Sequence, residues 1–381
     1  MDRDVNTEVA LTVSERDVAG VKQRLAAWVG ELVAEGAMPE ISDLRRPEGG
    51  GLSSVSLLFE ATWPDGSAPA LGLVARMPPE QTSFPVFPSY DFRLQYDVMV
   101  AVREHSDVPV PELVGLDESG EVVGEPMILM RRVTGVIPTD NPPYVFGGWL
   151  YDADPPSRQE VEESSVGVLA GLHGIEDAER RFPGLARLAG VDALRSHFEG
   201  QRDYYEWTTS TDGIRVPVIE RAFAWLEERW PQDVGPTVLS WGDARIGNIL
   251  YDGTRPVGVL DWEMAALGPR ELDLGWFLFM HRFFQDIAEV FELPGIPGFL
   301  ERDAVVSMYE RMTGHTVRNL DWFLVYAALR HAIVMARIKR RMIHFGEEER
   351  PPSPDDYVMH KEGLQSLLDG TYQWPSTEAR A

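Results

Sequence analysis

The stretch that decides the fold reads WGDARIGN at 241–248 and ends, after an apolar run, in VLDWE at 259–263. Between them, NILYD and PVGVLDW surround a DGTRP turn, a pattern that predicts two short antiparallel strands joined by a tight turn. Because the outer ends of such a hairpin lie side by side, we expect Asn248 and Asp261 to be close neighbours. Asp243 precedes the first strand in a Gly-flanked loop and should face the same place.

These three side chains have donor atoms suited to a particular chemistry. An Asn amide oxygen and a carboxylate suit Mg²⁺, which keeps some of its waters and is usually shared with substrate phosphates. Asp243 then remains as a carboxylate able to orient and deprotonate a hydroxyl. Taken alone, Asp243 and Asn248 are more simply turn residues that bond to nearby backbone groups, but Asp261 and the pattern of the flanking regions favour the chemical interpretation.

The flanking regions differ in character. Residues 41–133 contain short β-rich runs such as SVSLLFEATW and PMILMRRV and one helix that includes Phe92 and Met99, which predicts an antiparallel sheet in the order β-β-β-α-β-β. We therefore divide the chain into an N-terminal helical extension, a nucleotide-binding N-lobe, a linker with an insertion, and a catalytic and substrate-binding C-lobe, at residues 1–40, 41–133, 134–157 and 158–381.

Helical patterns dominate elsewhere. An amphipathic helix is expected over Glu15 to Glu35, where apolar residues recur at helical spacing. Beyond the linker, helical segments are expected near 158–176, 191–207, 216–230, 270–290, 301–313, 319–345 and 355–369. The C-lobe is therefore predicted to be mainly helical, apart from the hairpin.

Composition excludes several classes of function. The chain has 381 residues, 44% of them hydrophobic, which is globular and too long for one compact core. Its formal net charge of −26 repels nucleic acid and anionic membranes, and the absence of Cys removes thiolate chemistry. No stretch is apolar enough for a membrane span, so we expect a cytoplasmic protein whose partner is a small molecule. The sequence leaves the oligomeric state open.

The spacing of Asp243, Asn248 and Asp261 is that of the protein kinase catalytic loop and its metal-binding Asp. With WGDARIGN and LDWEMAALGPRELDLGW, the chain resembles the aminoglycoside phosphotransferase and choline kinase-like superfamily over roughly residues 40–345. The last run is similar to a bacterial aminoglycoside phosphotransferase branch that includes the kinase-like part of some acyl-CoA dehydrogenase fusions. This resemblance implies an α+β, protein kinase-like fold of two lobes, with MgATP between them.

The resemblance also implies nucleotide-binding residues. Gly49, Gly51, Ser53 and Ser54, in GGGLSS, look like the turn that covers the phosphates. Arg76, in VARM, occupies the place of the kinase strand lysine and would contact the phosphates.

Other positions follow from the same resemblance. Gln95 stands where the family has the Glu that pairs with the strand lysine, so this pair carries no net salt bridge. Met130 and Arg131 belong to the hinge, with backbone groups near adenine. Trp241 replaces the usual His, which we interpret as a change of scaffold. Arg245, two residues after Asp243, would reach the transferred phosphate.

Residues outside this set have simpler interpretations, with two exceptions. Asp273, in ELDLGW, is expected to satisfy backbone groups within the helical lobe rather than to bind a metal. The histidines lack the spacing of a zinc site, and only Arg330 and His331, on a late helix, stand out as further residues of interest.

The sequence thus predicts a kinase that moves the γ-phosphoryl group of ATP to a hydroxyl of a small molecule. Asp243 would be the base, and Asn248 and Asp261 would hold Mg²⁺. A rival interpretation is a nucleotide-binding regulatory module without transfer activity, suggested by Arg76, Gln95 and Trp241.

Charge gives two indications about the acceptor. The acidic chain favours cationic acceptors such as amino sugars, whereas RIKRR at 337–341 suggests an anionic one such as a hydroxyacyl-CoA. That basic run is more simply a solvated helix end, where cations complement the helix dipole. Neither the acceptor nor the choice between ATP and GTP is decided by the sequence.

Overall fold

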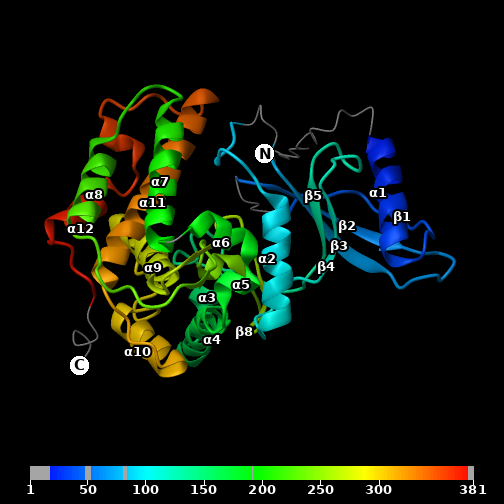
Figure 1. The fold of residues 1–381 in the computed structure, drawn as a ribbon, viewed down its shortest axis with the longest axis horizontal. Coiled ribbons are helices and arrows are strands. Elements are labelled where there is room, and N and C mark those ends of the chain that lie inside the picture. The colour runs from blue at the N-terminus through cyan, green and yellow to red at the C-terminus, as the bar shows by residue number, and fades with distance from the viewer. Residues whose placement is uncertain (1–17, 48–52, 80–83, 191, 376–381) are drawn as a thin grey trace, which may run out of the picture. The chain divides into compact units, whose positions relative to one another are not determined.

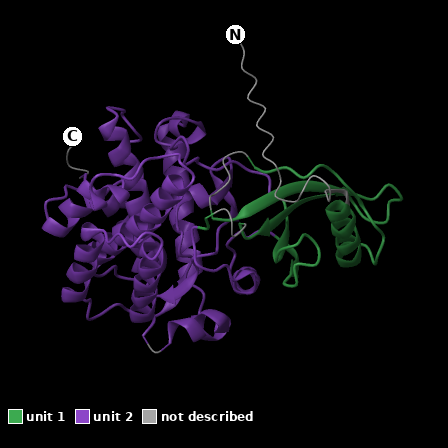
Figure 2. Cartoon of the chain, turned by 90° about the horizontal axis from the view of Figure 1, so that it is seen from above, with its two compact units in different colours: residues 1–85, 112–132 green, residues 86–111, 133–381 purple. Residues whose placement is uncertain are grey.

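The structure is a computed structural model that describes residues 18–47, 53–79, 84–190 and 192–375. The chain divides into two compact units, shown in Figure 2. Unit 1 comprises residues 1–85 and 112–132, and unit 2 comprises residues 86–111 and 133–381. The four-part domain division expected from the sequence stays a prediction.

Unit 1 is built on an antiparallel sheet of five strands, in the spatial order β1-β2-β3-β5-β4. The strands are β1 (Glu40–Ile41), β2 (Val55–Thr62), β3 (Leu71–Met77), β4 (Leu113–Asp117) and β5 (Met127–Arg131). Helix α1 (Val18–Val33) belongs to the same unit (Figure 1). The expected antiparallel sheet and its order along the chain are confirmed.

The two faces of this sheet differ because side chains alternate along each strand. Leu57, Phe59 and Leu73 point to one face and form a buried core with Leu25 and Val29 of α1. The side chains that alternate with these along the strands point to the other face, and Arg76 of β3 is one of them. Arg76 lies opposite Ser56 of β2 and Ile128 of β5 in the ladder, so these side chains share that second face.

Unit 2 is mainly helical, as expected. Its helices are α2 (Phe92–His105), α3 (Trp149–Asp152), α4 (Pro155–His173), α5 (Ala178–Arg181), α6 (Pro183–Ala189), α7 (Ala193–Thr209), α8 (Pro217–Glu228), α9 (Glu271–Val290), α10 (Arg302–Thr313), α11 (Leu320–His344) and α12 (Lys361–Asp369). Helices α9 and α11 pack along each other, and α7, α8 and α12 surround α11 (Figure 1).

Most of the expected helices lie within a few residues of their predicted bounds, but the short ones differ. Helices α3, α5 and α6 were not expected, because segments of four to seven residues are too short to show helical periodicity. The segment expected as one helix over 355–369 is a 3₁₀ turn at Pro354–Tyr357 followed by α12.

The expected hairpin is present in unit 2. Strand β7 (Ile249–Asp252) pairs with β8 (Arg255–Val259), and Ile249 lies opposite Val259. A second small sheet, which the sequence did not predict, joins β6 (Val238–Ser240) to β9 (Ala266–Gly268). The two sheets bracket the segments that contain Asp243 and Asp261. Among the described residues, no helix has the length and apolar character needed to cross a membrane.

Candidate active site

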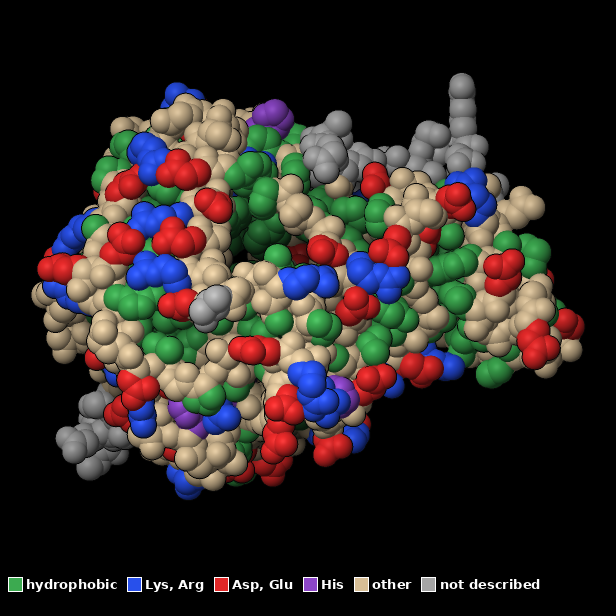
Figure 3. Space-filling view, viewed as in Figure 1, with side chains coloured by type: hydrophobic (Ala, Val, Ile, Leu, Met, Phe, Trp, Pro, Cys, Tyr) green, Lys and Arg blue, Asp and Glu red, His purple; other side chains and the backbone are tan. Residues whose placement is uncertain are grey.

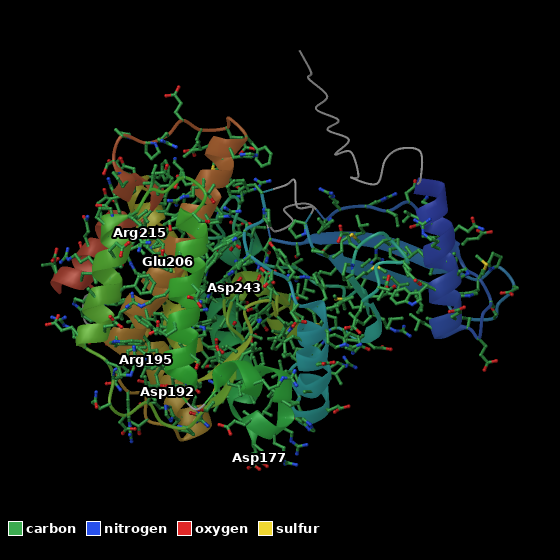
Figure 4. The ribbon with its side chains drawn as sticks, turned by 45° about the horizontal axis from the view of Figure 1, so that its top comes forward. Asp177, Asp192, Arg195, Glu206, Arg215 and Asp243 are labelled. Atoms are coloured by element: carbon green, nitrogen blue, oxygen red, sulfur yellow. The ribbon has the colours of Figure 1, made fainter. Side chains whose placement is uncertain are left out.

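Asp243 lies in unit 2 in the loop between β6 and a 3₁₀ turn at Ile246–Asn248, and its side chain is 15% exposed. Its carboxylate accepts three kinds of hydrogen bond. Trp276 Nε1 donates to Oδ1 at 2.8 Å, Asn248 Nδ2 donates to Oδ2 at 2.7 Å, and Arg245 Nε lies 3.0 Å from Oδ1. In Figure 4, Asp243 lies apart from the exposed pair Arg215–Glu206. The carboxylate is therefore held in one orientation while part of it stays accessible.

Asp273, at the start of α9, fixes the backbone that leads to Asp243. Its carboxylate accepts from Trp241 N at 2.7 Å, from Gly242 N at 2.9 Å and from Ser240 Oγ at 2.7 Å. His173 Nε2 lies 3.1 Å from Oδ2. Burial favours the neutral acid, but the hydrogen bonds from His173, Ser240 and Gly242 outweigh it and lower the pKa of Asp273. As expected from the sequence, this Asp satisfies backbone groups.

Trp241 and Gly242 join the Asp243 loop to the segment around Asp261. Trp241 is fully buried, and its Nε1 donates to the backbone oxygens of Leu260 at 2.8 Å and Asp261 at 3.2 Å. Gly242 has φ +91°, and a Cβ there would lie 2.0 Å from Met264 O, so only glycine fits. The tryptophan thus acts as part of the scaffold.

Asn248 and Asp261 lie at the same end of the hairpin. Leu260 N donates to Asn248 O at 2.9 Å, which makes Asp261 the next residue beyond the last cross-strand bond. Asp261 has φ +62°, a left-handed conformation that turns the chain out of the strand. Since the Asn248 amide nitrogen donates to Asp243, its amide oxygen is the atom left for another partner.

The described residues contain no cluster of three or more His, Cys, Asp or Glu side chains that would hold a metal ion by themselves. An ion at this end of the hairpin would have Asn248 Oδ1 and the Asp261 carboxylate as protein ligands and would take the rest from phosphate and water. Mg²⁺ accepts such a mixed set of oxygen ligands, so the residues present fit it.

Arg245 is held between two carboxylates. Its guanidinium pairs with Asp243 and, from the other side, with Asp140, which lies 105 residues earlier in the chain. Burial raises the pKa of Asp140, and the positive charge of Arg245 opposes that rise. Nothing in the local sequence around Asp140 distinguishes it, because it sits in the segment expected as a linker and meets Arg245 only in the folded unit.

Two further residues of unit 2 brace the site. Trp276 follows Asp273 by three positions on α9, so both side chains project from the same side of the helix. The guanidinium of Arg330, on α11, stacks on the Trp276 ring at 4.4 Å and donates to Gly242 O at 2.9 Å. Arg330 stood out in the sequence; Trp276 did not, although its spacing from Asp273 in ELDLGW is the signal that marks it.

The nucleotide-binding residues expected in unit 1 are placed as follows. Gly49 and Gly51 lie outside the described residues, and Ser53 and Ser54 lie half-buried just before β2. Met130 pairs with Val74 in the ladder and therefore shares the sheet face of Arg76, away from α1.

Arg131 points the other way. Its side chain forms an ion pair with Glu112 at 3.0 Å, and its backbone N–H donates to Glu112 O at 2.8 Å. This N–H therefore already has a partner in unit 1, and the expected place of Arg131 near adenine stays a prediction. Gln95, the position expected to pair with Arg76, is buried on α2 of unit 2.

The basic run at 337–341 does not form one positive patch. Arg337 is 5% exposed, stacks on Trp207 at 4.0 Å and donates to Thr211 Oγ1 at 2.9 Å. Arg340 pairs with Asp212 at 3.1 Å, and Lys339 pairs with Glu348. These cations serve packing and ion pairs within unit 2, so the run gives no support to an anionic acceptor.

Comparison with protein families gives a match over residues 74–312, more than half of the chain, to the model of the phosphotransferase enzyme family. The chain belongs to the phosphotransferase enzyme family. The hairpin with Asp243, Asn248 and Asp261 lies inside the matched range.

Solved phosphotransferases have the same fold. A protein of Ralstonia eutropha described as a putative aminoglycoside phosphotransferase aligns with a TM-score of 0.65 and 20% identity, over 92% of this chain and 97% of that one. The aminoglycoside phosphotransferase APH(4)-Ia, in a complex with ADP and hygromycin B, aligns with a TM-score of 0.55 and 16% identity, over 93% and 99% of the two chains.

The curated relatives of this phosphotransferase are longer proteins, and the chain matches a part of each. It is 24% identical over 276 residues to the probable acyl-CoA dehydrogenase IBR3 of Arabidopsis thaliana, covering 65% of this chain and 31% of that protein. It is 27% identical to acyl-CoA dehydrogenase family member 11 of Gallus gallus, covering 62% and 30%. The chain thus spans about a third of the length of the curated relatives it matches.

Proposed function

We propose that this phosphotransferase moves the γ-phosphoryl group of ATP to a hydroxyl of a small molecule, with Asp243 as the base. The observation that carries the proposal is the carboxylate of Asp243. Donors from α9, from its own loop and from the 3₁₀ turn before β7 hold it in place. The last of these donors is Asn248, whose backbone is bonded to the residue before Asp261. A structural turn residue would not need three separate side-chain donors.

The reaction needs little covalent chemistry from the protein. The acceptor oxygen forms a bond to the γ-phosphorus while the bond from that phosphorus to the bridging oxygen of ADP breaks. The acceptor proton passes to an Asp243 oxygen and then to solvent, which leaves ADP and a phosphate monoester. Positioning of the hydroxyl by Asp243 is therefore the main catalytic contribution of the chain.

Asn248 and Asp261 would hold Mg²⁺ through the amide oxygen and the carboxylate. The bound ion supplies positive charge that neutralises phosphate oxygens. By donating its amide nitrogen to Asp243, Asn248 also turns its amide oxygen away from the base, so one residue serves both positions.

Nucleotide contacts in this proposal come from the sheet of unit 1. Arg76 and Met130 share the sheet face away from α1, and Ser53 and Ser54 precede β2 at the end of the strand that carries Ser56. Arg76 would meet the phosphates with its positive charge, and Gly51 and both serines would cover them with backbone N–H groups. Met130 and the backbone oxygen of Arg131 would lie near adenine.

The first experiment is a measurement of ADP release by the purified full chain with MgATP and a broad panel of alcohols. Asp243→Ala should abolish release while ATP binding is largely kept, because this carboxylate acts on the acceptor. Asp252→Ala is the matched control, since Asp252 lies exposed in the same hairpin and forms its ion pair with the equally exposed Arg255. Asp261→Ala should weaken Mg²⁺-dependent ATP binding. Unchanged turnover in Asp243→Ala would falsify the assignment.

One observation favours the rival, a nucleotide-binding module that transfers nothing. Arg245 is committed to Asp140 and Asp243, so it is not free to meet a transferred phosphate unless one of these pairs opens. The same experiment separates the two functions. ATP binding without ADP release from any alcohol supports the module, and ADP release that depends on Asp243 supports the kinase.

A further inference from the structure

A cavity of about 330 Å³ is lined entirely by residues of unit 2. Its walls come from α6, α7 and α11, from the start of α2 with the segment before it, and from residues 262–267. On the face drawn in Figure 3, hydrophobic side chains surround a hollow beside α7. This volume lies at the lower end of the range found for pockets that bind small molecules.

The cavity adjoins the candidate active site. Trp262 and Glu263, in its wall, directly follow Asp261, and the next wall residue, Met264, contacts Gly242. Arg330, also in the wall, donates to Gly242 O at 2.9 Å. Gly242 directly precedes Asp243. Wall residues therefore adjoin the backbone next to both Asp243 and Asp261. Asp243 is not itself a wall residue, but Gly242, one position before it, contacts the wall residues Met264 and Arg330.

Most of the wall is apolar. The apolar and aromatic side chains that carry this character are Leu94, Leu185, Leu188, Trp262, Val334 and Phe87. Tyr204 adds a third aromatic ring, which lies 5.6 Å from the Phe87 ring and donates its hydroxyl to Val86 O at 2.9 Å. Its hydroxyl thus already has a partner. Such a wall stabilises a ligand by removing apolar area from water.

The charged groups of the wall are few, and most are engaged. Asp91 accepts from Leu94 N at 2.8 Å and so caps α2. Arg330 is 1% exposed and tied to Gly242 O and the Trp276 ring. His197 shares a hydrogen bond of 2.7 Å with Tyr326, and burial lowers its pKa to about 3, which keeps it neutral at pH 7.

Glu263 is the remaining carboxylate of the wall, and it lies near Tyr90 and Tyr204. An amino sugar with several ammonium groups needs several carboxylates, because each buried cation without a partner costs free energy. The described residues of this wall do not supply them.

We infer that the cavity binds the acceptor, and that the acceptor is a small alcohol with a mainly apolar body and at most one charge. This inference rests on the proposed function for its catalytic part, since the hydroxyl of the bound alcohol would be the oxygen that takes the phosphoryl group. The apolar cavity, adjoining both Gly242 and Asp261, is the observation that carries it. We expect a polycationic amino sugar not to be the acceptor.

The test begins with binding, which does not depend on turnover. Calorimetry on the full chain uses 4-phenyl-1-butanol as the apolar probe, and kanamycin as the polycationic probe. We expect saturable binding of the alcohol and none of kanamycin. Ala193→Phe, which fills the cavity from α7, should weaken alcohol binding at least tenfold. Ala224→Phe on the exposed side of α8 is the matched control and should leave it unchanged.

A second filling variant, Gln201→Trp on the same wall, guards against misfolding of the first. Failure of the wild-type chain to bind the alcohol, or binding that neither filling variant weakens, overturns the inference. Binding of kanamycin that the filling variants weaken also overturns the inference.

ADP release then separates this inference from the proposed function. Release with the alcohol, lowered by the filling variants through a higher KM for the alcohol and an unchanged KM for ATP, supports both. Release with kanamycin but not with the alcohol overturns the inference and keeps the kinase. Alcohol binding in the cavity without release from any acceptor keeps the binding site and overturns the kinase.

Discussion

Trp276 Nε1 is the donor that ties the proposed base to helix α9. It donates to Asp243 Oδ1 at 2.8 Å, while its ring supports the guanidinium of Arg330. Replacing the indole by a phenyl ring keeps the stacking and removes the donor. At the scale of single residues, this makes Trp276 a positioning residue, which acts on the acceptor only through Asp243.

Trp276→Phe should lower kcat about tenfold, which corresponds to a loss of about 1.4 kcal/mol of transition-state stabilisation. The KM for ATP should stay unchanged. The matched control is Trp322→Phe, which also removes a buried indole donor, here to Leu226 O at 3.0 Å. Both variants should lose roughly 1 kcal/mol of folding stability. Steady-state kinetics decides the question, and equal kcat values in the two variants would refute the positioning role.

At the scale of elements, helix α9 has two structural roles. It contains Asp273 and Trp276, and it packs along α11. Gly275 lies between these two residues, and a Cβ there would lie 2.9 Å from Phe323 O of α11. Gly363 is also in a helix, α12, but a Cβ there would meet nothing within 4 Å. The two glycines thus differ in whether an added methyl group would meet a neighbouring atom.

Gly275→Ala should destabilise the fold by about 1–3 kcal/mol, because the methyl group forces α9 away from α11. Gly363→Ala should instead stabilise it by up to about 1 kcal/mol, through the higher helix propensity of alanine. Urea denaturation of both variants measures the difference. Equal changes in the free energy of unfolding would show that α9 and α11 do not pack as closely as described.

Elements also show what the sequence could predict. The hairpin and the long helices repeat an apolar pattern over enough residues to be seen, and the antiparallel sheet of unit 1 follows from its alternation. The pairing of β6 with β9 has no such signal, because each strand has only three residues and they are far apart in the chain.

The candidate site divides in the same way. Asp243, Asn248 and Asp261 lie close in sequence and have a recognisable spacing. Asp140 reaches Arg245 only through tertiary folding, so no local pattern points to it. Trp276 could have been found from its position three residues after Asp273 on one helix.

At the scale of the whole molecule, charge and burial set the response to pH. The formal net charge is −26, but ion pairs such as Arg202–Glu227, at 2.8 Å, and Arg215–Glu206, at 2.5 Å, intersperse both signs over α7 and α8 (Figure 3). Buried histidines act differently. His281 is 6% exposed, and burial, together with the charge of Arg282, lowers its pKa to about 3.

His281 therefore makes unit 2 sensitive to acid. The unfolded chain binds a proton at this residue below about pH 6.5, whereas the folded chain stays neutral down to about pH 3, so stability falls as the pH drops through this window. At pH 5, the titration of His281 lowers the free energy of unfolding by about 2 kcal/mol.

His281→Gln removes the titrating group, and the difference in unfolding free energy between pH 7 and pH 5 should shrink by about that amount. Urea denaturation at both pH values measures it. An unchanged pH dependence in the variant would mean that His281 is protonated in the folded protein.

The central claim is that this phosphotransferase transfers a phosphoryl group to an alcohol through Asp243. The most direct measurement follows the label from MgATP labelled at the γ-phosphorus, in wild type and Asp243→Ala, with apolar alcohols as acceptors. The account predicts label in an organic phosphate ester with wild type and none with the variant. Label that appears only as inorganic phosphate, or equally in the ester with both proteins, would contradict it.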